Sequence, residues 1–589
     1  MIFLGINTEI FQAAIMRFSL DTAMRVLLVL CLVPLALATL DIEKPHDGPR
    51  VQTTLGGVRG FFDYSQNGRK YVAFEGIPYA QAPVGELRFR APQKPLPYTG
   101  DIVAIKTGPP CLQYIHTPID AKERIVGSED CLYLNVYKPV VESTKPLPVI
   151  IWIHGGAFQW HMEARDGQFT RPDYIMDRDV IFVTFSYRVG PLGFLSTGDE
   201  LISGNMGLKD QNMAIRWVKE NIKGFGGNSD EITLFGLSAG GVSVHYQYLT
   251  PLSKGLFKRG VSFSGNALNP WGITEAAPEK AKKVATIVGC PTEHVEEMVK
   301  CLKTRPARQI ARTDMDFMPW LFNPMTPFGP VVEKPTAESP FITKIPHEII
   351  SRGEAYDVPW ITGVVPEEGL YPGADFCTDD TLLKELDSRW DTLAPHVFDY
   401  NYTVPLSQHV AVGRKIREYY IGDKPVDKST AGAIVHAVGD RLYVMGGVKA
   451  AKMMAKVNRS PVRYYYFTYR GADSLSYAMT RNRVEWGVAH GDDPYYVVGS
   501  PFMNPTTTPE DRAMQRELLD IWVSYATNGE PDVGLEWTTV DPNSDELVYL
   551  HIKGPSKREM ESQANFGNTD LWYNIDFNEG KVAGKRVEL

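Results

Sequence analysis

The chain has 589 residues, of which 43% are hydrophobic and 22% are charged, as is typical of globular proteins with a large core. The formal net charge is only −9, and no run of Lys or Arg forms a basic patch of the kind that binds nucleic acid. We find neither an internal repeat nor a low-complexity tract. The sequence therefore predicts a globular protein without a nucleic-acid partner.

The N-terminal segment has the pattern of a secretory signal peptide. Met24 and Arg25 precede a short apolar run at 26–37, and an A-x-A pattern ends at Ala38. This order predicts cleavage after Ala38, because the apolar run is short for a membrane span. Acidic residues before position 24 do not suit a signal peptide, so translation starts either at Met24 or, with an unusually long leader, at Met1.

The rest of the chain is predicted to form one catalytic domain, residues 39–589. It contains no run of 18 apolar residues, no apolar tail for a lipid anchor and no Gly/Ser-rich linker. We therefore expect no membrane anchor in the mature form.

Apolar runs predict a sheet that helices cover on both faces. The runs at 148–153 and 180–185 are continuous, and apolar residues form one stripe of a helix at about 207–223. Strands that alternate with helices predict an α/β fold with a parallel, doubly wound sheet, over which 264–358 and much of 375–460 form helical insertions. Further strands are expected at 132–137, 232–235, 260–263, 358–365 and 462–469, and a hairpin is expected at 51–60. Residues 74–80 are rich in turn residues, and we expect them to lie beside a site.

Five cysteines remain after the signal peptide, and their number fits an oxidising compartment. By spacing, Cys111 and Cys131 would close one small surface loop, and Cys290 and Cys301 another. Cys377 is then left over and is expected to be buried and unpaired. Spacing alone does not determine the connectivity.

Residues 236–240 match the pattern G-x-S-x-G, with Ser238 at its centre. An apolar run at 232–235 precedes the match, and small residues that can begin a helix follow it. A strand, a sharp turn and a helix are the setting in which this pattern presents a nucleophilic serine above a sheet. The two glycines suit a turn where a Cβ would collide with the backbone, and the N–H of Ala239 could point at a developing oxyanion. The alternative is a Gly/Ser-rich turn without chemistry.

A second glycine pattern, His154-Gly155-Gly156, directly follows the apolar run at 148–153. An H-G-G pattern after an early strand supplies backbone N–H donors for an oxyanion hole. We therefore predict that Gly155, Gly156 and Ala239 donate to the oxyanion. The alternative is a plain Gly-Gly turn.

A nucleophilic serine needs a base and an acid that orients it, and in this fold type they follow the serine as acid and then histidine. His490 lies in a small, polar loop that could carry its ring to Ser238, whereas His245 is expected to pack on the helix after the serine. Glu367 and Glu368 both follow the strand expected at 358–365, and the pattern leaves either one as the acid. Their alternative role is that of an acidic pair at a helix start.

Together these motifs resemble the type-B carboxylesterase/lipase family, the cholinesterase-like branch of the α/β-hydrolases. The resemblance spans nearly all of the mature chain and is closest to insect carboxylesterases of the juvenile-hormone-esterase-like and venom carboxylesterase kind. Several long motifs occur in the family's order, which makes the resemblance specific. The markers are F-E-G-I-P-Y-A at 74–80, S-E-D-C-L-Y-L-N at 128–135, H-G-G at 154–156, F-G-G-N at 225–228, G-L-S-A-G-G at 236–241, Glu368-Gly369 and His490.

The resemblance implies an α/β-hydrolase fold and selects among the alternatives. The family acid is the glutamate directly before a glycine, which here is Glu368 rather than Glu367. The catalytic residues implied are therefore Ser238, Glu368 and His490, without a metal or cofactor. The resemblance also implies disulfides between Cys111 and Cys131 and between Cys290 and Cys301, and a salt bridge between Arg88 and Glu129.

Departures from the family narrow the substrate. Cholinesterases carry a tryptophan in the first disulfide loop, where it binds the choline cation, but residues 112–130 contain none. Leu237 stands where cholinesterases have glutamate and where juvenile hormone esterases usually have glutamine. A cholinesterase is therefore not expected, and the label of juvenile hormone esterase is weakened.

The expected function is that of a secreted serine carboxylesterase acting on small-molecule esters. The alternatives are a juvenile hormone esterase and a catalytically silent binding or adhesion protein on the same fold. Residues 586–589, R-V-E-L, are similar to retention signals of luminal carboxylesterases, so the endoplasmic reticulum lumen is the alternative location. Sequons predict glycosylation at Asn401 and Asn458.

Overall fold

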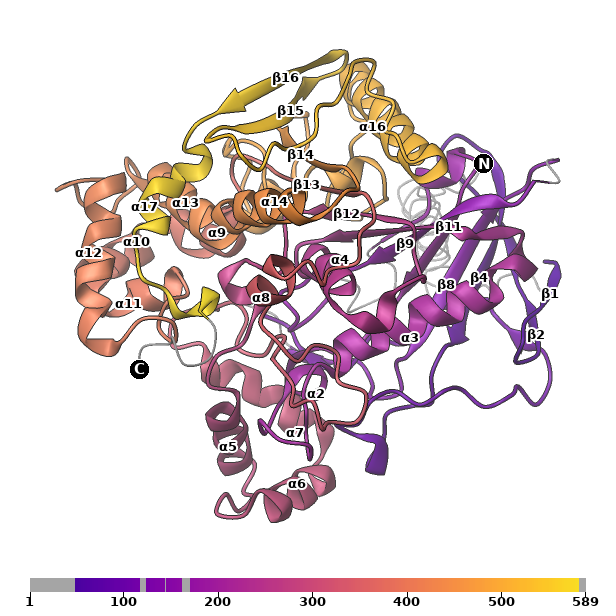
Figure 1. Ribbon diagram of the computed structural model, residues 1–589, viewed down its shortest axis with the longest axis horizontal. Helices are drawn as coiled ribbons and strands as arrows, with labels where there is room; N and C mark the ends of the chain where they lie inside the picture. Colours follow the sequence, from indigo (N-terminus) through magenta and orange to yellow (C-terminus); the bar gives the residue numbers. More distant parts are fainter. Residues whose placement is uncertain (1–47, 117–122, 143–144, 162–169, 582–589) are drawn as a thin grey trace, which may run out of the picture. The chain divides into compact units, whose positions relative to one another are not determined.

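An eleven-stranded sheet runs through the centre of the protein in the order β16-β15-β14-β13-β12-β11-β9-β10-β8-β4-β3. The structure, a computed structural model, describes residues 48–116, 123–142, 145–161 and 170–581 (Figure 1). The segment His46–Leu589 forms one compact unit. The predicted signal peptide, 1–38, and the C-terminal tetrapeptide, 586–589, lie outside the described residues.

The seven strands from β10 to β15 in that order pair in parallel, and the strands at the two edges pair antiparallel. Strands β10, β12 and β13 are buried along their whole length, as expected of strands with helices on both faces. The predicted mostly parallel α/β sheet is confirmed. The strands are β3 Phe61–Tyr64, β4 Lys70–Pro78, β8 Tyr133–Pro139, β9 Leu147–Ile153, β10 Ile181–Phe185, β11 Gly227–Leu237, β12 Arg259–Phe263, β13 Trp360–Val364, β14 Val462–Phe467, β15 Leu547–Gly554 and β16 Lys557–Gln563.

Helices pack on both faces of this sheet. Helices α3 (Met206–Asn221), α4 (Ala239–Leu249) and α14 (Met445–Val457) lie against one face, and α16 (Pro509–Asn528) lies against the other (Figure 1). Helix α3 covers the range predicted from its apolar stripe to within two residues at each end. The helix that follows the G-x-S-x-G pattern, α4, is entirely buried between the sheet and its neighbours.

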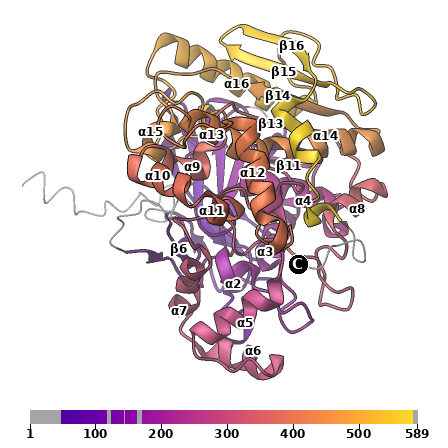
Figure 2. The same ribbon diagram turned by 90° about the vertical axis from the view of Figure 1, so that its left-hand side faces the viewer.

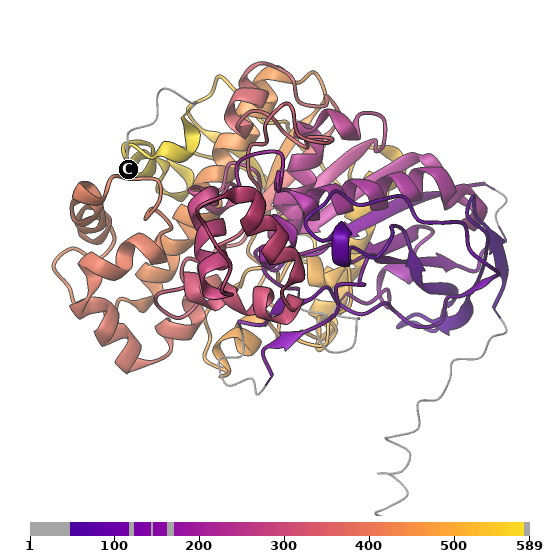
Figure 3. The same ribbon diagram turned by 90° about the horizontal axis from the view of Figure 1, so that it is seen from below.

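Long helical segments surround the carboxyl ends of the strands, as predicted for the insertions. In Figure 2 helices α9 to α13 lie in front of the strands, and in Figure 3 residues 277–312, in dark magenta, form a second helical group. The remaining helices are α2 Gly190–Phe194, α5 Ala277–Ile287, α6 Val295–Thr304, α7 Ala307–Arg312, α8 Pro346–Ser351, α9 Leu370–Cys377, α10 Asp380–Ser388, α11 Trp390–Val397, α12 His409–Tyr420, α13 Ala431–Gly439, α15 Leu475–Thr480 and α17 Thr569–Tyr573.

Two regions differ from the sequence-based expectation. Residues 74–78 belong to the nine-residue strand β4 rather than to a turn, because Phe74 and Ile77 are buried in the core while the chain pairs with β8. The antiparallel hairpin of β15 and β16 was not predicted. Strand β16 reads K-R-E-M-E-S-Q and has no buried residue. Its sequence therefore lacks the apolar pattern from which a strand could be predicted.

The N-terminal part of the chain also forms two small sheets. One has the order β1-β2-β5, in which β1 (Arg50–Gln52) and β2 (Gly57–Arg59) make the predicted hairpin and β5 (Ile102–Val103) adds in parallel. The other pairs β6 (Gln113–Tyr114) with β7 (Ile125–Val126) inside the loop that begins at Cys111.

The cysteine pairs and the salt bridge implied by the resemblance are present. Disulfides join Cys111 to Cys131 and Cys290 to Cys301, while Cys377 is buried and free. Arg88 binds Glu129 through two hydrogen bonds, of 2.6 and 2.7 Å, in a largely buried bidentate pair. Its third nitrogen also donates to backbone carbonyls just before α7, among them that of Arg305 at 2.6 Å. This arginine therefore ties the first disulfide loop to the helical group of α5 to α7.

Candidate active site

Ser238 occupies the sharp turn between β11 and α4. Its φ of 60° lies in the left-handed region, where a non-glycine residue is strained, and its side chain makes no capping hydrogen bond to the helix. A Cβ on Gly236 would lie 2.3 Å from the carbonyl oxygen of Gly240, and a Cβ on Gly240 would lie 1.9 Å from that of Ile153. The two glycines are therefore required by packing, and the turn presents the hydroxyl of Ser238 rather than using it as a cap.

The H-G-G segment lies directly against this turn. A Cβ on Gly155 would lie 2.7 Å from the carbonyl oxygen of Leu237 and 3.0 Å from the Cβ of Ser238. Gly156 has a φ of +105°, which favours glycine. Among the described residues, the N–H groups of Gly155, Gly156 and Ala239 donate to no backbone or side-chain acceptor. Three backbone donors without an acceptor in the described part of the chain thus lie close to Ser238.

His154 holds the segment in place. Its Nδ1 donates to the carbonyl oxygen of Gly155 at 2.8 Å, and its ring stacks on Tyr187 with centroids 4.1 Å apart. Tyr187 in turn donates to the carbonyl oxygen of His154 at 3.0 Å. The N–H and C=O of a trans peptide point in opposite directions, so fixing the carbonyl of Gly155 also fixes the N–H of Gly156. Burial lowers the pKa of His154 to about 4, so the ring is neutral at neutral pH.

His490 and Glu368 form a buried pair. Two loops meet in a parallel β-bridge between Glu367 and Ala489, which places the next residue of each loop side by side. His490 Nδ1 lies 2.5 Å from Glu368 Oε2, and the other carboxylate oxygen of Glu368 accepts from the N–H of Val365 at 3.0 Å. The side chain of Glu368 is 0% exposed. A buried carboxylate in this position keeps the Nδ1 proton on the ring and leaves Nε2 as the basic nitrogen.

The carboxylate of Glu367 contacts a different group. Its Oε2 accepts from the N–H of Val488 at 2.6 Å, two residues before His490. Of the two glutamates, Glu368 therefore contacts the imidazole and Glu367 contacts the backbone before it. The sequence pattern had left the two glutamates as alternatives.

Ser238 and His490 line one cavity together with Gly155 and Gly156. Nε2 of His490 is buried and has no hydrogen-bond partner within the described part of the chain, and no hydrogen bond joins it to the Ser238 hydroxyl there. Such hydrogen bonds are often long in enzymes without substrate. The other lining side chains are Trp152, His154, Trp160, Thr170, Leu237, Leu475, Met479, Tyr371 and Tyr495.

Two tyrosines that the sequence analysis did not single out enclose the imidazole of His490. Tyr371 stacks on it with centroids 5.6 Å apart and an interplanar angle of 17°, and Tyr443 lies 4.6 Å away. Tyr443 also donates to the carbonyl oxygen of Tyr371 at 2.9 Å. Tyr371 lies three residues after Glu368, which was a usable signal, whereas nothing near Tyr443 in the sequence connects it to His490.

Other predicted residues lie away from the cavity. His245 packs against Trp360 with centroids 4.4 Å apart, as expected for a helix-packing residue, and burial lowers its pKa to about 3. Asn401 is half-buried in a turn, and the side-chain nitrogen of Asn458 is buried at the end of α14. Glycosylation at these two positions stays a prediction.

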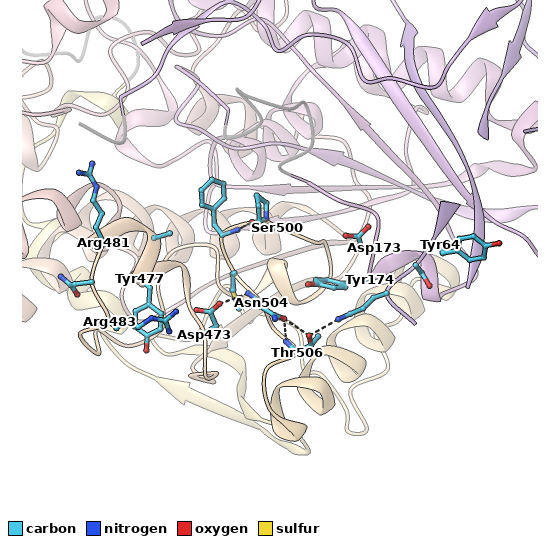
Figure 4. A pocket seen from close by; sticks show the side chains of 17 residues that line it. Tyr64, Asp173, Tyr174, Asp473, Tyr477, Arg481, Arg483, Ser500, Asn504 and Thr506 are labelled. Atoms are coloured by element: carbon cyan, nitrogen blue, oxygen red, sulfur yellow. Dashed lines mark hydrogen bonds between the residues drawn. The ribbon is translucent and has the colours of Figure 1, made fainter. Parts of the chain in front are cut away.

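A larger hollow, of about 980 Å³, shares no lining residue with the Ser238 cavity. Figure 4 shows the side chains that line this hollow. Helix α15 borders both, because Leu475 and Met479 line the cavity while Tyr477 lines the hollow. The described lining of the hollow includes Asp473, Arg481 and other polar side chains but no histidine. Chemistry that needs a serine and a histidine base therefore belongs to the smaller cavity.

Within the described ranges, no helix is both long and apolar enough to cross a bilayer.

Comparisons with known proteins agree on one family. Residues 47–572 match the Carboxylesterase family. The chain is 48% identical to a carboxylic ester hydrolase of Bombus ignitus, with 92% of this chain and 96% of that one covered, and 47% identical to venom carboxylesterase-6 of Apis mellifera, with 91% and 95% covered. A solved juvenile hormone esterase from Manduca sexta, with OTFP covalently attached, is similar in structure, with a TM-score of 0.78, 26% identity, and 89% of this chain and 99% of that one covered.

Proposed function

The chain belongs to the carboxylesterase family, and we propose that it hydrolyses esters with Ser238 as nucleophile, His490 as base and Glu368 as acid. It is a carboxylic ester hydrolase of the insect esterase kind, so the alternative of a catalytically silent binding protein is set aside. The observation that carries the proposed triad is the 2.5 Å contact between the buried His490 and Glu368, together with the cavity that His490 and Ser238 line.

The proposed reaction proceeds through an acyl-enzyme. Nε2 of His490 accepts the hydroxyl proton while Oγ of Ser238 attacks the ester carbonyl carbon. The carbonyl oxygen gains negative charge, which the free N–H groups of Gly155, Gly156 and Ala239 stabilise. His490 then gives its proton to the leaving alcohol. A water molecule repeats the attack on the acyl group, which leaves as a carboxylic acid and restores the serine.

The side chains around Ser238 favour esters without charge. Trp152, Trp160, Leu237, Leu475 and Met479 are apolar, and the described lining includes no acidic side chain that would bind a cation. A neutral acyl group and a neutral alcohol would bury apolar surface here without leaving a charge unpaired. This supports a general carboxylesterase. A juvenile hormone esterase of Tribolium castaneum is 35% identical to the chain, so a terpenoid methyl ester is the second substrate class to compare with short aryl esters.

We also propose secretion after cleavage behind Ala38. The two disulfides fit an oxidising compartment, and one relative is named a venom carboxylesterase. N-terminal sequencing of the protein from the culture medium should begin at Thr39. Retention of the protein inside the cell would instead favour the endoplasmic reticulum lumen.

The Ser238→Ala variant tests the proposed nucleophile. It should lose turnover of a short aryl ester by several orders of magnitude, because it lacks the hydroxyl on which the acyl-enzyme forms. Ser229→Ala is the matched control, since it removes a buried hydroxyl from the same strand, β11, outside the cavity. The melting temperature shows whether each variant is folded. If folded Ser238→Ala keeps most of the turnover, the proposal is wrong.

A further inference from the structure

The loop 487–492, which carries His490, lacks the backbone ladder that supports a strand. A single β-bridge, between Glu367 and Ala489, joins it to the neighbouring loop. Val488 is 2% exposed and Ala489 is 0% exposed, so their N–H groups cannot bond to water and need acceptors from the protein. Side chains supply both acceptors.

Glu367 is the first acceptor. Its Oε2 accepts from the N–H of Val488 at 2.6 Å, while its own backbone N–H donates to the carbonyl oxygen of Val488 at 3.1 Å. Gly487 packs on the same carboxylate: with a φ of +96°, a Cβ there would lie 2.2 Å from Glu367 Oε2. The carboxylate therefore fits against the loop and leaves no room for another side chain at position 487.

Asp492 is the second acceptor, from within the loop. Its Oδ2 accepts from the N–H of Ala489 at 2.9 Å and from the hydroxyl of Ser474 at 2.7 Å. Its Oδ1 accepts from the N–H of Leu475 at 2.8 Å. Because Leu475 lines the Ser238 cavity, Asp492 joins the histidine loop to the cavity wall.

We propose that Glu367 and Asp492 are positioning residues, which hold the loop so that His490 faces both Ser238 and Glu368. The inference rests on the proposed function, because it takes His490 as the base. Neither carboxylate touches the imidazole or the reacting atoms. Each acts on residues directly before His490, where a shift of the backbone moves the ring.

The cost of burying these groups supports a specific role. Burial raises the pKa of Glu367 to about 7 and that of Asp492 to about 6, so the protein keeps two carboxyl groups where their charged forms are disfavoured. Glu367 needs only an accepting oxygen, which a glutamine also has. Asp492 uses both oxygens as acceptors, and an asparagine could offer only one.

The test compares kcat and KM for a short aryl ester in Glu367→Ala, Glu367→Gln, Asp492→Ala and Asp492→Asn. Misplacement of a catalytic group by about 1 Å can cost about 100-fold, so we expect kcat of Glu367→Ala to fall about 10- to 100-fold with KM within about threefold. Glu367→Gln should restore most of kcat, because its amide oxygen accepts from Val488. Asp492→Asn should behave more like Asp492→Ala.

A second readout follows the hydrogen bond of His490 itself. The downfield proton NMR resonance of the proton between His490 Nδ1 and Glu368 should shift or broaden in both alanine variants. Asp375→Ala is the matched control: Asp375 is a half-buried carboxylate on α9 that makes no hydrogen bond to the loop within the described ranges, and burial raises its pKa to about 6. Its removal should leave kcat and the resonance unchanged.

The inference is overturned if folded Glu367→Ala keeps kcat within twofold and an unchanged resonance, or if Glu367→Gln loses as much as Glu367→Ala. If Glu367→Ala does not fold, Asp492→Asn decides: unchanged kcat and resonance overturn the inference, and a loss in both supports it. Failure of the proposed function looks different, because Ser238→Ala would then keep its turnover. In that case the carboxylate variants report on loop structure alone.

Discussion

Ser238 and His490 meet in one cavity, but the protein positions them by different means. The backbone positions Ser238: a buried strand, a left-handed turn and a helix leave space only for glycine at 236 and 240. Side chains position His490: Glu368 contacts its ring, and Glu367 and Asp492 accept hydrogen bonds from the two residues directly before it. A turn of fixed geometry has a local sequence pattern, whereas a loop held by side chains from elsewhere in the chain does not.

Because the packed backbone positions Ser238, we expect the turn at residues 236–240 to be the part of the site most sensitive to substitution. In Gly240→Ala the new Cβ would lie 1.9 Å from the carbonyl oxygen of Ile153, so the backbone must shift. We expect loss of activity together with a loss of a few kcal/mol in the free energy of unfolding, measured by denaturant titration. Gly432→Ala is the matched control, because Gly432 lies exposed in α13 with nothing within 4 Å of its added Cβ. A fully active Gly240→Ala variant would show that backbone packing does not position Ser238.

Removal of the charge beside His490 should lower activity and leave stability nearly unchanged. Glu368→Gln keeps the shape of the side chain but removes the charge that stabilises the imidazolium and the tautomer with a proton on Nδ1. We expect kcat to fall about 10³- to 10⁴-fold, with the melting temperature nearly unchanged, in contrast to Gly240→Ala. Glu367→Gln should lose far less, because it keeps the acceptor for Val488. Equal losses in the two glutamine variants would contradict the assignment of Glu368.

The smallest expected effect concerns stability alone. Asp493 is buried beside the histidine loop and accepts from the hydroxyl of Tyr465 at 2.5 Å, and burial raises its pKa to about 8. A carboxyl group with a raised pKa in the folded state stabilises the protein fully below the unfolded pKa, near 4, and loses this contribution as the pH rises toward 8.

Asp493→Asn cannot ionise, so its free energy of unfolding should fall less than that of the wild type between pH 5 and pH 8. The difference is at most about 4 kcal/mol, from three pH units at about 1.4 kcal/mol each. Denaturant titrations at both pH values measure it. Asp545→Asn, which removes an exposed carboxylate, should follow the wild type. Parallel curves for Asp493→Asn and the wild type would show that Asp493 is not neutral in the folded protein.

The sequence supported prediction of the parts whose structure depends on nearby residues. The strands with continuous apolar runs, the turn at Ser238 and the H-G-G segment were all predicted at their positions. The pattern singled out His490 and left Glu367 and Glu368 as alternatives, between which the resemblance selected Glu368. Glu368 and His490 are 122 residues apart, and no local pattern predicts their contact.

The remaining features depend on contacts between distant segments. Tyr443 contacts His490 from the helical segment between α13 and α14, and Glu367 accepts a hydrogen bond from Val488, which lies 121 residues away in the sequence. The exposed strand β16 forms because β15 offers an edge, and not because its own residues are apolar. Such contacts are set by tertiary packing, which overrides local preference.

The most direct test of the proposed triad is to locate the residue that an organophosphate probe modifies. Peptide mass spectrometry after labelling of the wild-type protein should place the phosphoryl group on Ser238, with complete loss of ester hydrolysis at one label per chain. Glu368→Gln should react far more slowly at the same residue. Modification of a different residue, or full hydrolysis by protein labelled at Ser238, would contradict the assignment of Ser238, His490 and Glu368.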